Sequence, residues 1–182
     1  MSFIEEIKKR AKKDIKTIIL PESEDKRVLE AASKVTKEGF SKIILLGDEE
    51  KIKEDCQKYE INLDGVDIIN PLTSDKKEEY KNKLYELRKN KGMTLEQAEI
   101  LLKEPIYFGM MMLKDENSKA DGLVSGAAHS TANTLRPALQ ILKTKPETKL
   151  VSAFFVMCVP DCVYGENGTF IFGDSGLNQN PT

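Results

Sequence analysis

The stretch TIILPESEDKRVLEAASKVTKEGFSKIILLG, residues 17–47, decides the fold. It opens with a short apolar run rich in β-branched residues, 17–20, and closes with a second apolar run, 43–46. Between the two runs, Ser23 can cap a helix, and Gly39 is well suited to end that helix in a left-handed conformation. A strand, a helix and a second strand in this order predict a parallel pair of strands joined by a crossover helix.

The same alternation continues on both sides of this stretch. Before it, an amphipathic helix begins near Phe3, and after it a capping box at Thr94 and Gln97 marks another helix start. Further strands are expected at 66–69 and 122–124, and further helices at about 49–59, at 75–89 and at about 131–143. Two more helices are expected to begin at Leu95 and at Glu104-Pro105, the second running through Met112. The pattern predicts an α/β fold of three layers, with a mainly parallel sheet flanked by helices.

The pattern changes after Lys145-Pro146, where two apolar strands follow at 151–159 and 169–172. A pair of strands is marginal by itself, so these strands need further partners. We therefore predict a first α/β domain over residues 1–148. Residues 149–182 are expected to form the beginning of a second α/β domain that is truncated.

Composition excludes several classes of protein. The chain has 182 residues, 28 Lys and Arg against 30 Asp and Glu, and a net charge of −2, which argues against nucleic acid as a partner. Apolar runs are too short to span a bilayer, and the start of the chain does not resemble a signal peptide. Three scattered cysteines and a single histidine favour free thiols, no metal site and a cytoplasmic location.

The segment DGLVSGAAHSTANTLRP, residues 121–137, has the residue types of an anion site. A strand leads into small residues around Ser125, and Ser130 and Thr131 stand at a helix start, followed by Arg136. Free backbone N–H groups, hydroxyls and a guanidinium would converge there on a phosphate or acyl phosphate. An ordinary capped helix with a surface arginine explains the same residues, so the residue types leave both interpretations open.

Three further residues bear on this segment. Pro137 fits the first turn of a helix that begins near Thr134. His129 is the only histidine and invites a general-base role, but no carboxylate lies near it in sequence, so a positional or structural role is favoured. Composition alone makes Arg88 a solvated cation at the end of a charged helix.

Four segments together resemble the phosphate acetyltransferase (phosphotransacetylase) family. These are ILPESEDKRVLEAA (19–32), YELRKNKGMTLEQA (85–98), DGLVSGAAHSTANTLRPALQ (121–140) and SAFFVMCVPDCVYGENGTFIFGDSGLNQNP (152–181). The resemblance implies two α/β domains with a cleft between them, commonly in a homodimer. It also implies the conversion of acetyl-CoA and phosphate into CoA and acetyl phosphate, with the CoA thiol as nucleophile and no other cofactor.

The resemblance also implies roles for individual residues. Arg136 matches an arginine at the CoA and phosphate end of the family's cleft, and Arg88 matches an arginine implicated in CoA binding. Ser125, Ser130 and Thr131 match small polar cleft residues near the acyl phosphate. The family's catalytic serine, arginine and aspartate are expected beyond Thr182, so the 182-residue chain is predicted to be inactive.

Two alternatives stay open beside phosphate acetyltransferase. A phosphate butyryltransferase differs only in the acyl length that its pocket accepts. A non-catalytic module that senses acyl-CoA would keep the binding residues without the catalytic ones.

Overall fold

The structure is a computed structural model that describes residues 2–148 and 151–173. The chain divides into two compact units. The larger unit is Ala11–Lys143, and the smaller one comprises Met1–Arg10 and Thr144–Thr182. The division into domains 1–148 and 149–182 stays a prediction, because compactness alone does not show which segments fold independently.

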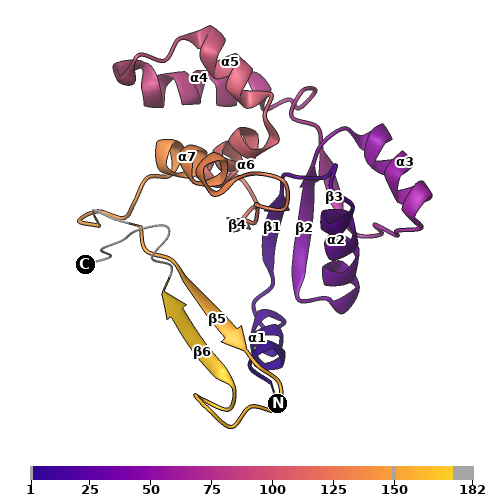
Figure 1. Cartoon of the computed structure of the whole chain (residues 1–182). Coiled ribbons are helices and arrows are strands. Elements are labelled where there is room, and N and C mark those ends of the chain that lie inside the picture. The colour runs from indigo at the N-terminus through magenta and orange to yellow at the C-terminus, as the bar shows by residue number, and fades with distance from the viewer. Residues whose placement is uncertain (1, 149–150, 174–182) are drawn as a thin grey trace. The chain divides into compact units, whose positions relative to one another are not determined.

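The larger unit is built on a four-stranded sheet in the order β3-β2-β1-β4 (Figure 1). All three strand pairs are parallel, which confirms the predicted α/β fold. The register pairs Ile18 with Ile43, and Ile19 with Leu123. The strands are β1 (Lys16–Leu20), β2 (Ser41–Leu46), β3 (Asp67–Ile69) and β4 (Gly122–Leu123).

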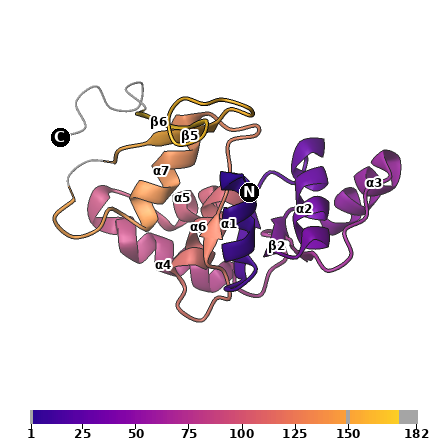
Figure 2. The ribbon, with the colours of Figure 1, turned by 90° about the horizontal axis from the view of Figure 1, so that it is seen from below.

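Helices cover both faces of the sheet because β2 is apolar on both (Figure 2). Ile43 and Leu45 share a core with α2 (Lys26–Glu38) and α3 (Glu49–Tyr59). Ile44 and Leu46 point to the opposite face and share a core with α4 (Lys77–Arg88), α5 (Leu95–Leu102), α6 (Pro105–Lys114) and α7 (Thr131–Ile141). The short 3-10 helix η1 (Lys89–Lys91) follows α4 and has no buried residue.

Helix α6 lies directly against the sheet, and its residues from Ile106 to Met112 are all buried. Gly109 permits this approach, since a Cβ at that position would lie 2.6 Å from Leu123 Cδ1 on β4. The helix thereby packs against the short edge strand β4 that leads into the candidate site.

The smaller unit contains α1 (Phe3–Ala11) and an antiparallel hairpin of β5 (Phe154–Cys158) and β6 (Thr169–Gly173). β5 is shorter than the predicted strand 151–159, and β6 extends one residue beyond the predicted strand 169–172. Phe155 and Phe172 pair across the hairpin, and both are more than half exposed. Within the described residues, no helix is long and apolar enough to cross a membrane.

Candidate functional site

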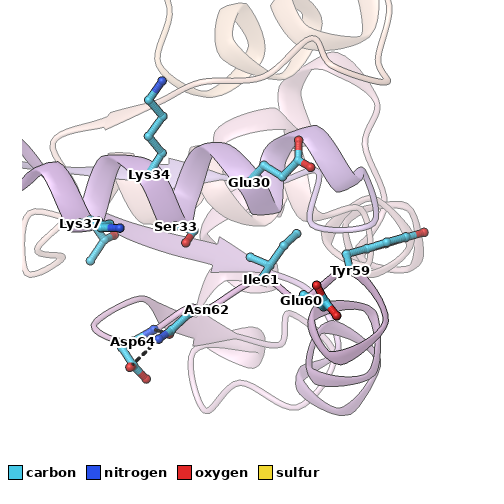
Figure 3. Close-up of a pocket in the computed structure, with 10 residues that line it drawn as sticks. Glu30, Ser33, Lys34, Lys37, Tyr59, Glu60, Ile61, Asn62 and Asp64 are labelled. Atoms are coloured by element: carbon cyan, nitrogen blue, oxygen red, sulfur yellow. Dashed lines mark hydrogen bonds between the residues drawn. The ribbon is translucent and has the colours of Figure 1, made fainter.

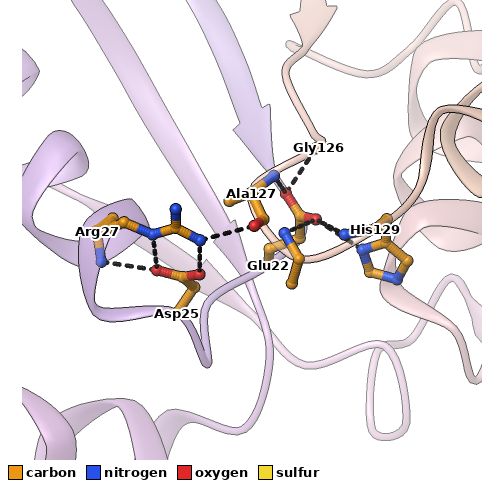
Figure 4. A network of polar contacts seen from close by, with 7 residues as sticks. Glu22, Asp25, Arg27, Gly126, Ala127 and His129 are labelled. Carbon is orange, nitrogen blue, oxygen red and sulfur yellow. Dashed lines mark hydrogen bonds and ion pairs between the residues drawn. The ribbon is translucent and has the colours of Figure 1, made fainter.

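The candidate site lies at the edge of the sheet where β1 and β4 end. Because the two strands are parallel neighbours, their carboxyl ends meet at the same edge. The N–H of Asp121 donates to the carbonyl of Thr17 (2.8 Å), and the N–H of Val124 donates to that of Ile19 (3.0 Å). The segment after β1 therefore lies beside residues 125–130, which we call the edge loop (Figure 4).

A buried carboxylate fills the centre of the edge loop. Glu22, only 1% exposed, accepts hydrogen bonds from four consecutive backbone N–H groups. The donors are Gly126 (2.9 Å), Ala127 (3.0 Å), Ala128 (2.9 Å) and His129 (2.8 Å). The expectation that these N–H groups are free for an external anion is therefore wrong, because the chain supplies the anion itself.

The same carboxylate holds the imidazole of His129, whose Nδ1 lies 2.7 Å from Glu22 Oε1. Burial by itself raises the pKa of Glu22, but hydrogen bonds from the Ala128 N–H, the His129 ring and the other loop N–H groups lower it to about 2. An ionised carboxylate only accepts, so Nδ1 carries the hydrogen of this bond. The carboxylate partner that the sequence around His129 lacks thus comes from the end of β1.

A second link joins the edge loop to the start of α2. Arg27 Nη2 donates to the carbonyl of Ala127 (2.7 Å), and Asp25 accepts from both Nε (3.0 Å) and Nη2 (2.6 Å) of Arg27. Asp25 also caps α2, which corrects the prediction that Ser23 does so. Ser23 is buried and donates instead to the carbonyl of Leu46 (2.8 Å), so its hydroxyl cannot reach the helix end.

Helix α7 begins at once after the edge loop. Ser130 is its N-cap and accepts from the N–H of Asn133 (3.3 Å), and Thr131 is its first residue. The helix thus starts where the predicted range 131–143 begins, and not near Thr134 as a first-turn position of Pro137 requires. Pro137 is consequently a buried residue inside the helix, not one of its first turn.

The two predicted arginines, far apart in sequence, act on the same buried phenol. Arg88 ends α4 and is half-buried, whereas Arg136 is exposed on α7. Burial raises the pKa of Tyr107 on α6, and the positive charges of Arg136 and Arg88 act in the opposite direction. Tyr107 Oη also donates to Gln140 Oε1 (3.1 Å), one helical turn beyond Arg136. Arg88 is therefore more enclosed than composition alone indicates.

Unpartnered polar atoms occur on α4, on the edge loop and on α7. In the described part of the chain, four buried side-chain polar atoms have no hydrogen-bond partner, and three of them are Arg88 Nε, Ser125 Oγ and Thr134 Oγ1. Because buried polar groups are almost always hydrogen-bonded, these three atoms have spare hydrogen-bond capacity.

A large hollow in the described part of the chain lies elsewhere, between α2, α3 and residues 60–64 (Figure 3). This hollow of about 790 Å³, the α2–α3 groove, is lined by both signs of charge, including Lys34, Lys37 and Glu30. Asn62 and Asp64 in its wall bond each other (2.8 Å). Among the described residues, no cluster of His, Cys, Asp and Glu in either region could hold a metal ion.

Sequence reasoning missed Glu22, Arg27 and Tyr107. A signal for Glu22 was present, because it follows the strand 17–20 just as the edge loop follows the strand 122–124. Parallel strands bring such segments to one edge. Nothing local to Tyr107 indicates its nearness to two arginines, which depends on how α4, α6 and α7 pack.

Comparison with known proteins identifies the family. The family described as "Phosphate acetyl/butaryl transferase" matches residues 2–182. A phosphate acetyltransferase of Acetivibrio thermocellus is 58% identical over 100% of this chain and 53% of its own length. One of Clostridium acetobutylicum is 50% identical over 100% of this chain and 54% of its own length.

Solved structures agree with the sequence matches. EutD phosphotransacetylase from Staphylococcus aureus has a TM-score of 0.79 at 42% identity, over 95% of this chain and 51% of its own. A phosphotransacetylase from Streptococcus pyogenes has a TM-score of 0.82 at 35% identity, over 94% of this chain and 51% of its own. This chain spans about half the length of the curated relatives it matches. With the family matched over nearly every residue, the chain belongs to the phosphate acetyl/butaryl transferase family.

Proposed function

We propose that this chain forms the part of a phosphate acetyltransferase that binds the anionic substrates. The reaction converts acetyl-CoA and phosphate into CoA and acetyl phosphate. The observation that carries the proposal is the set of unpartnered buried atoms on α4, the edge loop and α7, namely Arg88 Nε, Ser125 Oγ and Thr134 Oγ1. The positive charges of Arg136 and Arg88 also act on a common side chain, Tyr107. Family membership supports the reaction class.

The chemistry of this region suits phosphate groups. Guanidinium groups are permanently charged donors with a planar fork that matches phosphate oxygens, and hydroxyls add neutral donors. Among the carboxylates nearby, Glu22 has its oxygens already occupied by the edge loop, whereas Glu104 opposes the two arginines in its effect on Tyr107. We assign CoA or phosphate contacts to Arg136 and Arg88, and acyl-phosphate contacts to Ser125, Ser130 and Thr131.

In the direction from acetyl phosphate to acetyl-CoA, the proposed nucleophile is the CoA thiol. Its sulfur forms a bond to the acetyl carbon of acetyl phosphate, the bond from that carbon to the phosphate oxygen breaks, and the thiol proton goes to a base. A base and a stabiliser of the carbonyl oxyanion are therefore required in addition to the substrate donors. We propose that the residues in those roles are not among these 182, so the chain binds ligand weakly and does not turn over acetyl phosphate by itself.

Homodimer assembly and a cytoplasmic location are part of the same proposal and rest on the resemblance to the family. A butyryl substrate is the second candidate, because the matched family includes both acetyl and butyryl transferases. The two candidates differ in the acyl length that the complete site accepts.

The test uses the purified 182-residue chain with CoA, acetyl phosphate and butyryl phosphate. NMR titration measures binding, and thioester formation measures turnover. We expect saturable binding of CoA and acetyl phosphate that Arg136→Ala weakens, with no turnover. Tighter binding of butyryl phosphate would favour the butyryl candidate. Turnover would place the catalytic groups within this chain, and complete absence of binding would contradict the assigned site.

A further inference from the structure

We infer that Glu22 is a positioning residue, a built-in anion around which residues 126–129 fold so that the edge loop presents its side chains to the ligand. The inference rests on the proposed function only in naming that ligand as CoA or acetyl phosphate. It assigns Glu22 no contact with the substrate.

The geometry shows that Glu22 holds the whole loop. Its Oε2 accepts from Gly126 and Ala127, and its Oε1 accepts from the N–H groups of Ala128 and His129 and from the His129 ring. Successive N–H groups that converge in this way form a nest, a concave site for anions. Here the anion is covalently attached and buried, so it imposes one loop conformation.

The hydrogen bonds that Glu22 already accepts also exclude a role for it as the base that takes a substrate proton. A carboxylate offers about four lone-pair positions, and five N–H donors already converge on Glu22. No acceptor capacity is left for a substrate proton. Glu22 therefore acts through the residues that it holds.

Two of the residues whose positions depend on Glu22 flank the nest without contacting the carboxylate. Ser125 precedes Gly126, and Ser130 follows His129 and caps α7. The backbone path between these two serines is the segment bound to Glu22, so their separation and orientation depend on that carboxylate. Gly126 contributes a φ of 113°, which other residues rarely adopt and which turns the chain into the nest.

The third residue is His129, whose ring is 22% exposed. Its Nδ1 bond to Glu22 fixes both the orientation of the ring and the position of its hydrogen. The direction in which the remaining nitrogen, Nε2, points is thereby fixed. Loss of the carboxylate would release the loop and leave the tautomer of His129 undetermined.

The experiment compares wild type with Glu22→Gln, Glu22→Asp and the control Glu24→Gln, an exposed residue two positions away. NMR of the chain reads the amide signals of residues 126–129 and the imidazole nitrogens of His129. A CoA titration of each variant measures affinity.

In Glu22→Gln we expect displaced loop amide signals, loss of the Nδ1–H tautomer and CoA binding weaker by about tenfold, as for a lost charged hydrogen bond. Glu22→Asp, which keeps the charge with a shorter reach, is expected to recover part of each effect. Glu24→Gln is expected to behave as wild type. A stabilising role alone would lower the unfolding temperature of Glu22→Gln without changing the tautomer or the affinity, and that result overturns the inference.

Two outcomes need separate treatment. If Glu22→Gln does not fold, Glu22→Asp decides, and wild-type amide signals and affinity in that variant overturn the inference. If the wild-type chain binds no CoA, the proposed function fails. The role of Glu22 is then tested by the amide signals and the His129 tautomer alone.

Discussion

The edge loop and the α2–α3 groove are two polar regions of the larger unit, and they differ in what their polar atoms do. The groove is a hollow of about 790 Å³ whose walls carry both signs of charge, and one of its lining residues has an unpartnered buried atom, Thr36 Oγ1. The edge loop has one such atom, Ser125 Oγ, beside a saturated internal carboxylate. Two more such atoms, Arg88 Nε and Thr134 Oγ1, lie on α4 and α7.

The proposed site therefore rests on unsatisfied hydrogen-bond capacity and not on the volume of a hollow. A groove between two helices arises wherever their side chains do not fill the space. Buried polar atoms without partners are rare and cost free energy, so they persist where a ligand uses them. Four predictions test this comparison, from the largest expected effect to the smallest.

The largest effect concerns acid stability. The pKa of Glu22 is about 2 in the folded chain against an ordinary value of 4.5, so its ionised form stabilises the fold above about pH 4.5. That contribution, on the order of 3 kcal/mol, is expected to disappear as the pH falls from about 4.5 toward 2.

Urea unfolding of the chain across this pH range measures the effect. Glu22→Gln should show lower stability at pH 7 and a shallower dependence on pH below 4.5 than wild type. Glu30→Gln in the α2–α3 groove is the matched control and should follow the wild-type curve. An equally steep acid loss in Glu22→Gln would show that other carboxylates cause it.

The next effect is on ligand affinity. Arg136→Ala is expected to weaken CoA binding roughly 10–100-fold, because a charged hydrogen bond contributes about 1.5–3 kcal/mol. Arg136→Lys should recover only part of the loss, since an ammonium lacks the planar fork. Titration of both variants with CoA, beside a thermal unfolding curve, separates binding from folding. Identical affinities in all three proteins would favour the capped helix with a surface arginine.

A smaller effect distinguishes two serines. Ser125→Ala removes a hydroxyl that has no partner in the protein, so we expect unchanged stability and acetyl phosphate binding weaker by roughly 2–10-fold. Ser23→Ala removes a buried bond to the Leu46 carbonyl, so stability should fall by about 1 kcal/mol. Urea unfolding and acetyl phosphate titration of both variants check this contrast. The reverse pattern would show that Ser125 has a structural partner.

The smallest expected effect lies in the α2–α3 groove. Lys34→Ala changes an exposed cation of that groove and should leave the affinities for CoA and acetyl phosphate within about twofold of wild type, as for a surface change away from a site. Titrations of Lys34→Ala with CoA and with acetyl phosphate measure these affinities. A loss as large as that of Arg136→Ala would mean that the groove, despite its mixed charge, holds part of the ligand.

Several features follow from the sequence by itself. The apolar runs 17–20 and 43–46, with a capped helix between them, were enough to predict the parallel sheet, because strand and helix periodicities are local properties. The hydroxyls of residues 125–131 and Arg136 were also readable, since they lie in one continuous segment. The assignment of those residues to substrate contacts stays a prediction.

Which groups of residues 125–131 are free for a ligand was decided only by the tertiary structure. Glu22 lies about a hundred positions before the edge loop, and its carboxylate, not a substrate, takes the loop's four N–H groups, because β1 and β4 end side by side. The packing of α4, α6 and α7 likewise brings Arg88 and Arg136 to the same phenol. Residue type indicates which groups can bind an anion. Whether a group is free to do so depends on neighbours that are distant in sequence, and these are set by sheet order and helix packing.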